Sequence, residues 1–258
     1  MNPKPTVTAI IPARYASTRL PAKPLIDLGG KPMIQHVYER TKQATLVTNV
    51  IVATDHGEIA ATVRAFGGEC VMTAADIRSG SDRIASVSKN LPRSDIIVNV
   101  QGDEPLIAPQ MIDEAIRPMI ENPKIDVATL VKKIDAIEDI VNPNVVKVVL
   151  DIAGNAIYFS RATIPFIRDA AENAVGHKQF IYYKHIGLYV YRKEFLLSFA
   201  SWDESTLERT EKLEQLRIIE HGFKIKATIT GYDSIPIDTP DDAERVRRIL
   251  QQLKGTHL

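Results

Sequence analysis

The feature that most constrains the fold is an alternation of short apolar runs with helix-like segments through the first half of the chain. The apolar runs are brief and rich in Val and Ile, which indicates buried strands. Strands are expected at residues 7–11, 49–54, 69–72 and 95–100, and helices at residues 33–38, 58–66 and 81–91. This rhythm predicts an α/β fold, with a mostly parallel central sheet and helices on both faces.

The pattern changes in the second half of the chain. Residues 145–150 and 156–160 flank a Gly154-Asn155 turn and predict a β-hairpin. Residues 182–192 alternate, which predicts a strand with one apolar face and one face available for contacts. The apolar face would carry Ile186, Leu188 and Val190, and the other face His185, Gly187, Tyr189 and Tyr191. We expect a single domain over residues 1–258, with an insertion at about 151–215 that adds a smaller β-rich layer.

A loop rich in positive charge follows the first expected strand. Arg14, Arg19 and Lys23 lie within ten positions, and Pro21 and Pro24 prevent a regular helix there. At the carboxyl edge of an open α/β sheet such a loop predicts an anion site, and we favour the polyphosphate of a nucleotide as its ligand. The loop has neither the Walker A pattern nor the Gly-x-Gly-x-x-Gly turn of dinucleotide-binding proteins. The alternative is an ordinary loop whose cations are solvated.

Acidic and amide side chains follow the last expected strand of the first half. Gln101, Asp103 and Glu104 come directly after it, at the same sheet edge as the cationic loop. Carboxylate oxygens suit Mg²⁺, which takes one or two carboxylates together with phosphate oxygens. We therefore expect a Mg²⁺ site that includes Asp103, the alternative being a turn with surface acids. A weaker signal is the glycine turn at residues 78–83, where the start of a helix can hold a phosphate or a polar edge.

The charge balance excludes large classes of partner. The chain has 32 Lys+Arg and 32 Asp+Glu residues, and hence no net formal charge. Nucleic-acid and membrane-surface binders carry a strong basic excess, so we expect neither kind of partner. Cys70 is the single cysteine and allows no disulfide framework, which indicates a reducing compartment. No apolar run approaches 18 residues and no leader pattern is visible, so we expect a cytoplasmic protein.

Several motifs together resemble the sugar-acid cytidylyltransferases. In the first half they are Ile11-Pro12-Ala13-Arg14, Ser17-Thr18-Arg19-Leu20-Pro21, Lys23-Pro24-Leu25, Ala53-Thr54-Asp55, Ser79-Gly80-Ser81-Asp82-Arg83 and Asn99-Val100-Gln101-Gly102-Asp103-Glu104-Pro105. In the second half they are Asn144-Val145-Val146-Lys147, Tyr158-Phe159-Ser160-Arg161, Lys184-His185-Ile186-Gly187-Leu188-Tyr189 and Glu211-x-x-Glu214-Gln215. The later motifs are similar to family members that activate 3-deoxy-manno-octulosonate (Kdo). The resemblance runs from about residue 8 to about residue 249.

The resemblance implies a Rossmann-like nucleotidyltransferase fold and a reaction in which CTP and Kdo give CMP-Kdo and pyrophosphate. It also implies Mg²⁺ as cofactor, a homodimer, and a product used in lipopolysaccharide assembly. The implied catalytic residues are Lys23, Arg14, Arg19, Asp103 and Asp238, of which Asp103 and Asp238 would be the metal ligands. The implied nucleotide-binding residues are Ala13, Arg14, Arg19, Lys23, Ser79, Gly80, Ser81, Arg83 and Gln101. The implied sugar-binding residues are Gln101, Arg161, His185, Tyr189, Glu214 and Gln215.

Some of these assignments have alternatives in the residues themselves. Asp238 lies beside Thr239 and Pro240, a typical helix start, so the alternative for it is a capping role. A single His such as His185 is more often packed than catalytic, and Glu214 opens a helix whose polar face would be solvated. Arg161 follows a strand, where an Arg that binds the carboxylate of Kdo would lie. Ala22 stands where the family pattern has Gly, which puts the flexibility of the loop in doubt.

Serine at position 81 is a second departure, since the family pattern has Thr there, and it puts one hydroxyl contact in doubt. The sugar could also be 8-amino-Kdo or sialic acid, because a single polar contact decides between such substrates. Two other classes of protein fit the sequence less well. A silent nucleotide-binding module has no need of the pair Asp103 and Asp238, and an oxidoreductase would need the missing glycine-rich turn. No residue is an unambiguous general base.

Overall fold

The computed structural model describes residues 5–16, 20–168 and 180–255. It divides into two compact units, the first formed by Met1–Asp113 with Asp233–Leu258 and the second by Glu114–Tyr232. The expected insertion at 151–215 lies within the second unit, which is wider than that segment. The expectation that the chain is a single domain stays a prediction. None of the helices in the described part of the chain has the length and apolarity needed to cross a membrane.

The first unit is built on a parallel sheet with the strand order β3 (Glu69–Met72), β2 (Asn49–Thr54), β1 (Val7–Ala13) and β4 (Ile96–Asn99). The four strands expected from the apolar runs are thus confirmed. β1 runs through Pro12 to Ala13, two residues further than expected. Pairing of β1 with β4 ends at Ile10 and Asn99, so the missing N–H of Pro12 removes no hydrogen bond on that side.

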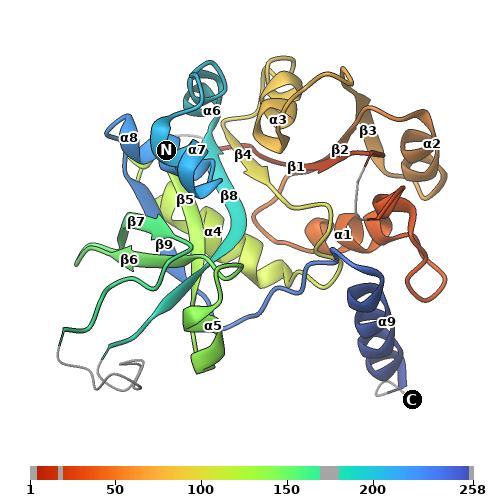
Figure 1. Ribbon diagram of the computed structural model, residues 1–258. Coiled ribbons are helices and arrows are strands. Elements are labelled where there is room, and N and C mark those ends of the chain that lie inside the picture. The colour runs from red at the N-terminus through yellow and green to blue at the C-terminus, as the bar shows by residue number, and fades with distance from the viewer. Residues whose placement is uncertain (1–4, 17–19, 169–179, 256–258) are drawn as a thin grey trace. The chain divides into compact units, whose positions relative to one another are not determined.

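Helices cover both faces of this sheet. They are α1 (Met33–Lys42), α2 (Gly57–Ala65) and α3 (Gly80–Ser88), and Figure 1 shows α1 and α3 on opposite sides of β1 and β2. The core between them is fully buried and includes Ile10, Ile11, Val52 and Ile97. Burial on both faces explains why these strands are almost wholly apolar in sequence. The predicted α/β fold with a mostly parallel sheet is confirmed for this unit.

The last helix, α9 (Pro240–Gly255), returns to the first unit. Thr239 caps it, because its Oγ1 accepts a hydrogen bond from Asp242 N at 3.2 Å. Val246 and Leu250 of α9 pack with Leu28, which precedes α1, and with Met33, which begins it. This contact fixes the residues just before α9 beside the loops that follow β1 and β4.

The second unit contains a mixed sheet with the strand order β8 (Tyr183–Arg192), β5 (Val127–Lys133), β9 (Ile225–Ile229), β7 (Asn155–Ser160) and β6 (Lys147–Leu150). β6 also pairs with β8, so the pairings form a closed circuit. The expected hairpin is confirmed, with β6 and β7 antiparallel. The short helices of this unit are α5 (Ile137–Val141), α6 (Lys193–Phe199), α7 (Thr206–Glu211) and α8 (Gln215–Glu220), and α4 (Pro109–Glu121) runs from the first unit into the second.

The face of β8 that was expected to be available for contacts is exposed only in part, at His185 and Gly187, which are half-buried. Tyr189 and Tyr191 are buried, as are the residues of the expected apolar face. The register of β8 against β5 shifts by two residues between Thr129 and Leu130. A shift of two keeps the alternation of faces, so Tyr189 and Tyr191 are buried because both faces of β8 are covered in that part of the strand.

Candidate active site

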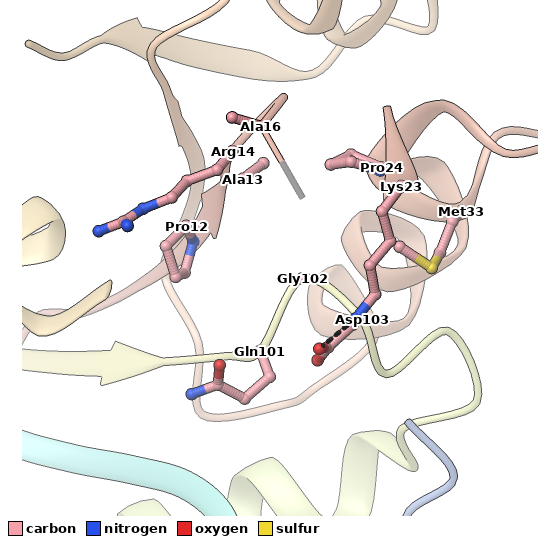
Figure 2. Close-up of a pocket in the computed structure, with 10 residues that line it drawn as sticks. All are labelled: Pro12, Ala13, Arg14, Ala16, Lys23, Pro24, Met33, Gln101, Gly102 and Asp103. Carbon is pink, nitrogen blue, oxygen red and sulfur yellow. Dashed lines mark hydrogen bonds and ion pairs between the residues drawn. The ribbon is translucent and has the colours of Figure 1, made fainter. Parts of the chain in front are cut away.

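An open cleft of roughly 340 Å³ lies at the carboxyl ends of β1 and β4, within the first unit (Figure 2). It is lined by Pro12, Ala13, Arg14, Ala16, Lys23, Pro24, Met33, Gln101, Gly102 and Asp103. β1 and β4 are neighbouring parallel strands, so the loops that leave them meet at one edge of the sheet. The two sequence signals, the cationic loop and the acidic turn, are thus brought together as expected.

The approach of the two loops depends on Gly102. A Cβ atom at this position would lie 2.7 Å from the carbonyl oxygen of Pro12 and 3.5 Å from Ile11. Real Cβ atoms do not approach a backbone oxygen that closely, so any side chain would push the loops apart. Gly102 therefore allows Asp103 to reach the position that it occupies in the cleft.

The ammonium of Lys23 lies between the two predicted metal ligands. Lys23 Nζ donates to Asp103 Oδ2 at 2.7 Å and to Asp238 Oδ1 at 3.0 Å. Asp238 reaches this point because Ile237 N donates to Asp103 O at 2.9 Å, just before α9 begins. Capping of α9 is done by Thr239, which leaves the carboxylate of Asp238 for the cleft. Carboxylate oxygens from two distant segments thus converge on one cation.

Two carboxylate oxygens supply only part of the ligands that a metal ion needs. Among the described residues there is no group of three or more His, Cys, Asp or Glu side chains that could hold a metal. Mg²⁺, however, usually takes only one or two carboxylates and completes its octahedron with water and substrate phosphate oxygens. The convergence of Asp103 and Asp238 on a single point within 3.0 Å of each fits that mode of binding.

The other predicted cations are placed differently. Arg14 lines the cleft, but its Nη2 donates to the carbonyl of Ile77 at 2.9 Å, and Figure 2 shows it pointing away from Lys23. Arg19 lies outside the described residues. Ala22 N donates a hydrogen bond to Tyr15 O at 3.2 Å. Of the expected phosphate clamp, the structure thus brings Arg14 and Lys23 to the cleft.

The glycine turn before α3 lies next to the end of β1. Gly80 faces Pro12, 3.6 Å from where its Cβ would be, and Ser79 caps the helix by accepting from Asp82 N at 3.0 Å. Arg83 is completely buried and forms an ion pair with Asp55 at 2.8 Å. It therefore ties α3 to the end of β2 from within the core. Ser81 is also buried, so the contacts of Ser79, Gly80, Ser81 and Arg83 with a nucleotide stay predictions.

Glu104 is a buried carboxyl group beside the cleft. Its side chain is only 6% exposed, and its Oε2 has no hydrogen-bond partner among the described residues. Burial and the neighbouring charge of Asp103 raise the pKa of Glu104 to about 7. Its burial directly after Asp103 places it to orient that residue.

Three of the predicted sugar-binding residues share one neighbourhood in the second unit. The rings of His185 and Tyr189 are 5.2 Å apart, and the charge of Glu214 contributes, after burial and Tyr191, to a raised pKa of Tyr189. The hydroxyl of Tyr189 is buried and has no hydrogen-bond partner among the described residues, and the same holds for Gln215 Nε2. Buried polar atoms without partners are costly, which points to a ligand or water that completes them.

His185 is held in one orientation. Its Nε2 lies 3.1 Å from Thr129 Oγ1, and that hydroxyl donates to the carbonyl of Leu188 at 2.8 Å. Because the hydroxyl proton is used there, Nε2 carries the ring proton and Nδ1 is the acceptor. Loss of hydration lowers the pKa of His185 to about 3, so the ring is neutral.

Arg161 is bound by loop carbonyls. Its Nε donates to Glu211 O at 2.7 Å and its Nη1 to Pro143 O at 3.1 Å. The carboxylate of Glu211 in turn accepts from Ser160 Oγ at 2.6 Å and from Arg161 N at 2.9 Å. The sugar contact of Arg161 stays a prediction, whereas its support of the loop that leads to Glu214 is visible.

Two supporting residues were missed by the sequence reasoning as functional positions. Lys147 is buried, and its Nζ donates to the carbonyls of Asn142, Val145 and Arg161 at 2.6–2.8 Å. Glu211 links the end of β7 to the segment before α8. Both occur in the motifs that carry the resemblance, and that is the only signal that could have found them.

Known proteins resemble this chain along almost its whole length. The model of the family described as "Cytidylyltransferase" matches residues 8–225. The chain belongs to the cytidylyltransferase family. It is 52% identical to a protein of Geobacter sulfurreducens and 54% identical to one of Geotalea uraniireducens, both named 3-deoxy-manno-octulosonate cytidylyltransferase. Each match covers 96% of this chain and 99% of the relative.

Solved structures of cytidylyltransferases match as well. A structure described as CMP:2-keto-3-deoxy-manno-octonic acid synthetase complexed with CTP has a TM-score of 0.89 and 42% identity, covering 96% of this chain and 99% of that one. A 4-diphosphocytidyl-2C-methyl-D-erythritol synthase from Anaerococcus prevotii shares the fold, with a TM-score of 0.64 at 14% identity. The predicted nucleotidyltransferase fold is therefore confirmed.

Proposed function

We propose that this cytidylyltransferase transfers the cytidylyl group of CTP to Kdo and releases pyrophosphate. The observation that carries the proposal is the meeting of Lys23, Asp103 and Asp238 in a cleft at the carboxyl edge of a parallel sheet. That edge is where nucleotides bind in open α/β sheets. The names of relatives more than half identical over nearly the whole chain supply the sugar.

The reaction forms one bond and breaks one. The anomeric oxygen of the sugar bonds to the α-phosphorus, and the bond from that phosphorus to the bridging oxygen of pyrophosphate breaks. Such transfers need positioning and charge neutralisation more than a covalent nucleophile. Lys23 and Arg14 line the cleft and would neutralise charge on the leaving pyrophosphate, with Arg19 from the same loop. Gln101 also lines the cleft and would lie between nucleotide and sugar.

Asp103 and Asp238 would hold the Mg²⁺ of this reaction. Their oxygens converge within 3.0 Å of a single cation, which suits a metal shared between two carboxylates and phosphate oxygens. When bound, the ion would neutralise phosphate charge and make the attacking hydroxyl more acidic. The cofactor assignment is a proposal that removal of the metal tests directly.

The sugar pocket is proposed to lie with His185, Tyr189, Glu214 and Gln215. The Tyr189 hydroxyl and Gln215 amide, which have no partner among the described residues, offer donors to sugar oxygens, and neutral His185 offers Nδ1 as an acceptor. Arg161 would serve the carboxylate of Kdo. The same chemistry on 8-amino-Kdo or another sugar acid is the alternative substrate assignment.

The biological setting is also part of the proposal. A homodimer, a cytoplasmic location and a product used for lipopolysaccharide assembly follow from the family resemblance. Light scattering after gel filtration tests the dimer, since one chain has a mass of 28.7 kDa. A mass near that of a single chain at micromolar concentration would contradict it.

The deciding experiment is pyrophosphate release from CTP and Mg²⁺ with Kdo, 8-amino-Kdo or sialic acid, each with and without EDTA. We expect release with Kdo that is abolished by EDTA and reduced at least ~100-fold by Asp103→Asn, because an aligned charged group is lost at the reacting phosphates. Asp203→Asn is the matched control, since Asp203 is exposed in the second unit and lies outside the proposed site. Release only with another acid would change the substrate, and no release with any acid would refute the activity.

A further inference from the structure

The strongest unexplained feature of the cleft is that one ammonium ion-pairs with both predicted metal ligands. The side chain of Lys23 is 12% exposed, against 32% for Asp103 and 40% for Asp238. The most enclosed member of the group is thus the lysine, which sits between the two carboxylates. Its position is the one that a cation shared by these carboxylates would take.

This arrangement makes the local charge unsuitable for a divalent cation. Two carboxylates with an ammonium between them carry a net charge of minus one, whereas the carboxylates alone carry minus two. A dication entering such a site would meet an ammonium within about 3 Å, a strong repulsion where water is partly excluded. The lysine therefore competes with the metal for the same oxygens.

The lysine is also able to leave. It is anchored by the short 3-10 helix η1 (Lys23–Leu25), and only its terminal ammonium bonds to the carboxylates. A lysine side chain carries its charge on a flexible four-carbon stem, so rotation about side-chain bonds can move the charge without a change in backbone. Lys23 lines the open cleft, into which the ammonium can turn.

We propose that Lys23 occupies the cation position of the nucleotide-free enzyme and blocks metal binding there until a triphosphate draws the ammonium away. This inference rests on the proposed function, because it takes Asp103 and Asp238 as the metal ligands. Arrival of the triphosphate supplies a new partner for the ammonium and adds phosphate oxygens to the vacated carboxylates. Metal and nucleotide then bind cooperatively, each favouring the arrangement that the other requires.

The test measures metal affinity without any nucleotide or sugar. Mn²⁺ serves as the probe, because the signal of the free ion in electron paramagnetic resonance reports how much is bound. Removing the competing charge in Lys23→Met should tighten Mn²⁺ binding by about tenfold or more relative to the unmodified protein. Lys23→Gln serves as a second variant should Lys23→Met fold poorly, and thermal unfolding checks both.

A matched control distinguishes the removal of a competing ammonium at the metal position from a general effect of net charge on Mn²⁺ affinity. Lys31→Met makes the same substitution at a lysine that pairs with Glu39 at 2.7 Å, away from the cleft. We expect its Mn²⁺ affinity to stay within about twofold of the unmodified protein, since surface charges are screened by salt. If Lys23→Met and Lys23→Gln bind Mn²⁺ no more tightly than Lys31→Met, the proposal is wrong.

Further variants locate the metal. The double variant Lys23→Met with Asp103→Asn should lose the tighter Mn²⁺ binding of Lys23→Met, because that binding depends on the Asp103 carboxylate. Tighter Mn²⁺ binding that persists in the double variant would refute the proposal. Asp103→Asn alone is measured with CTP present. If it leaves Mn²⁺ binding unchanged, the proposed metal site itself fails. If it weakens binding while the Lys23 variants show no gain, only the role of Lys23 fails.

Discussion

Ala22 adopts a backbone conformation that an L-residue avoids. Its φ and ψ angles are 52° and 29°, in the left-handed region, at the start of the 3-10 helix that carries Lys23. The family pattern has Gly at this position, and the structure gives the reason, since Gly adopts this conformation without a steric cost. Ala22, which departs from the family pattern, is thus a strained residue directly before Lys23.

Replacing Ala22 by Gly should stabilise the protein. Relief of the left-handed strain outweighs the entropy that Gly loses on folding, for a net gain of about 1 kcal/mol in the free energy of unfolding. Lys212 also has a φ of 52°, so Lys212→Gly should shift stability in the same direction. Urea unfolding measures both.

Ala61→Gly is the matched control for these two variants. Ala61 is exposed within α2, where Gly costs about 1 kcal/mol because the helix constrains a freer backbone. Opposite signs for Ala22→Gly and Ala61→Gly are expected. A loss of stability in Ala22→Gly similar to that in Ala61→Gly would contradict the left-handed conformation of Ala22.

His185 should stay neutral throughout the physiological range. Its pKa is lowered from 6.5 to about 3 by loss of hydration, so the native state takes up a proton only in strong acid. The unfolded chain binds that proton below about pH 6.5, and the contribution of His185 to stability therefore falls as the pH drops from 6.5 towards 3. Above pH 6.5 the contribution is complete.

Nuclear magnetic resonance of the imidazole protons checks this directly. The His185 signals should not shift between pH 5 and pH 8, and His185→Gln should reduce the acid sensitivity of the unfolding free energy below pH 6.5. A titration of His185 near its ordinary pKa would show instead that the ring is hydrated and open to protonation.

At the residue scale, the sequence predicted the chemistry of the cleft better than its contacts. Asp103 and Asp238 were identified together by resemblance, but nothing in the spacing placed Lys23 between them. Arg83, whose contact with the nucleotide stays a prediction, is paired in the core with Asp55, and the sequence did not indicate that pairing. Such contacts depend on how separate loops approach one another in the fold, and a single sequence does not contain that information.

Among the structural elements, the segment from α7 to α8 depends most on side-chain support. Glu211 ends α7 and accepts from Ser160 Oγ and Arg161 N, while its carbonyl accepts from Arg161 Nε. Lys212, in the left-handed conformation, then turns the chain towards Glu214. The predicted sugar-binding residues of α8 are thus positioned by contacts with β7.

Truncating Glu211 should lower the free energy of unfolding. Glu211→Ala leaves the Ser160 hydroxyl and the Arg161 N–H without their acceptor, and buried donors without partners cost about 1–3 kcal/mol. Glu204→Ala is the control, because Glu204 is exposed and pairs with Lys212 only at 3.9 Å. It should change stability by less than about 0.5 kcal/mol.

Chemical unfolding with urea compares the two glutamate variants under one condition. Equal effects of Glu211→Ala and Glu204→Ala would show that the contacts of Glu211 contribute nothing to stability. The KM for Kdo of Glu211→Ala, measured at a temperature where the variant is folded, then reports whether the α8 residues have lost their positions.

At the element scale, prediction succeeded where local signals agreed. The strands of the first unit and the hairpin of β6 and β7 follow from apolar runs and a glycine turn. The burial of Tyr189 and Tyr191 on the face of β8 that was expected to be available for contacts comes from packing on both faces, a tertiary feature without a local signal. α7 was not expected, although Ser205 and Glu208 form a capping box at its start that could have been recognised.

For the whole molecule, ligand binding should appear as stability. CTP with Mg²⁺ at a hundredfold excess over the dissociation constant should add about 2.7 kcal/mol to the free energy of unfolding. For a chain of this size each kcal/mol corresponds to about 2–4 °C in the melting temperature. Differential scanning calorimetry should therefore show a rise of roughly 5–10 °C for the transition that includes the first unit.

The same scan with EDTA is the control. Without the metal, the nucleotide would lose the contacts that the proposed ligands Asp103 and Asp238 make through it, so the rise should be clearly smaller. An identical rise with and without EDTA, and in Asp103→Asn, would mean that CTP binds independently of these carboxylates.

The division into two units is the part of the overall organisation that the sequence did not indicate. The chain passes from the first unit to the second at Asp113 and Glu114, inside α4, and returns at Tyr232 and Asp233. The continuous helix at the first crossing and the absence of a Gly/Ser linker leave no compositional boundary to detect. Family membership, in contrast, was predictable, because it depends on motifs spread along the chain.

The missing side chain of Gly102 has a consequence for how this enzyme can change over generations. With 2.7 Å between a prospective Cβ and the Pro12 carbonyl, a mutation to any other amino acid at this codon would displace a backbone segment of the cleft. Substitution of Gly102 therefore cannot produce a new substrate preference. Such a preference must arise at positions whose side chains already project into the cleft. In a saturation library, position 102 should be nearly invariant among active clones, whatever sugar the selection rewards.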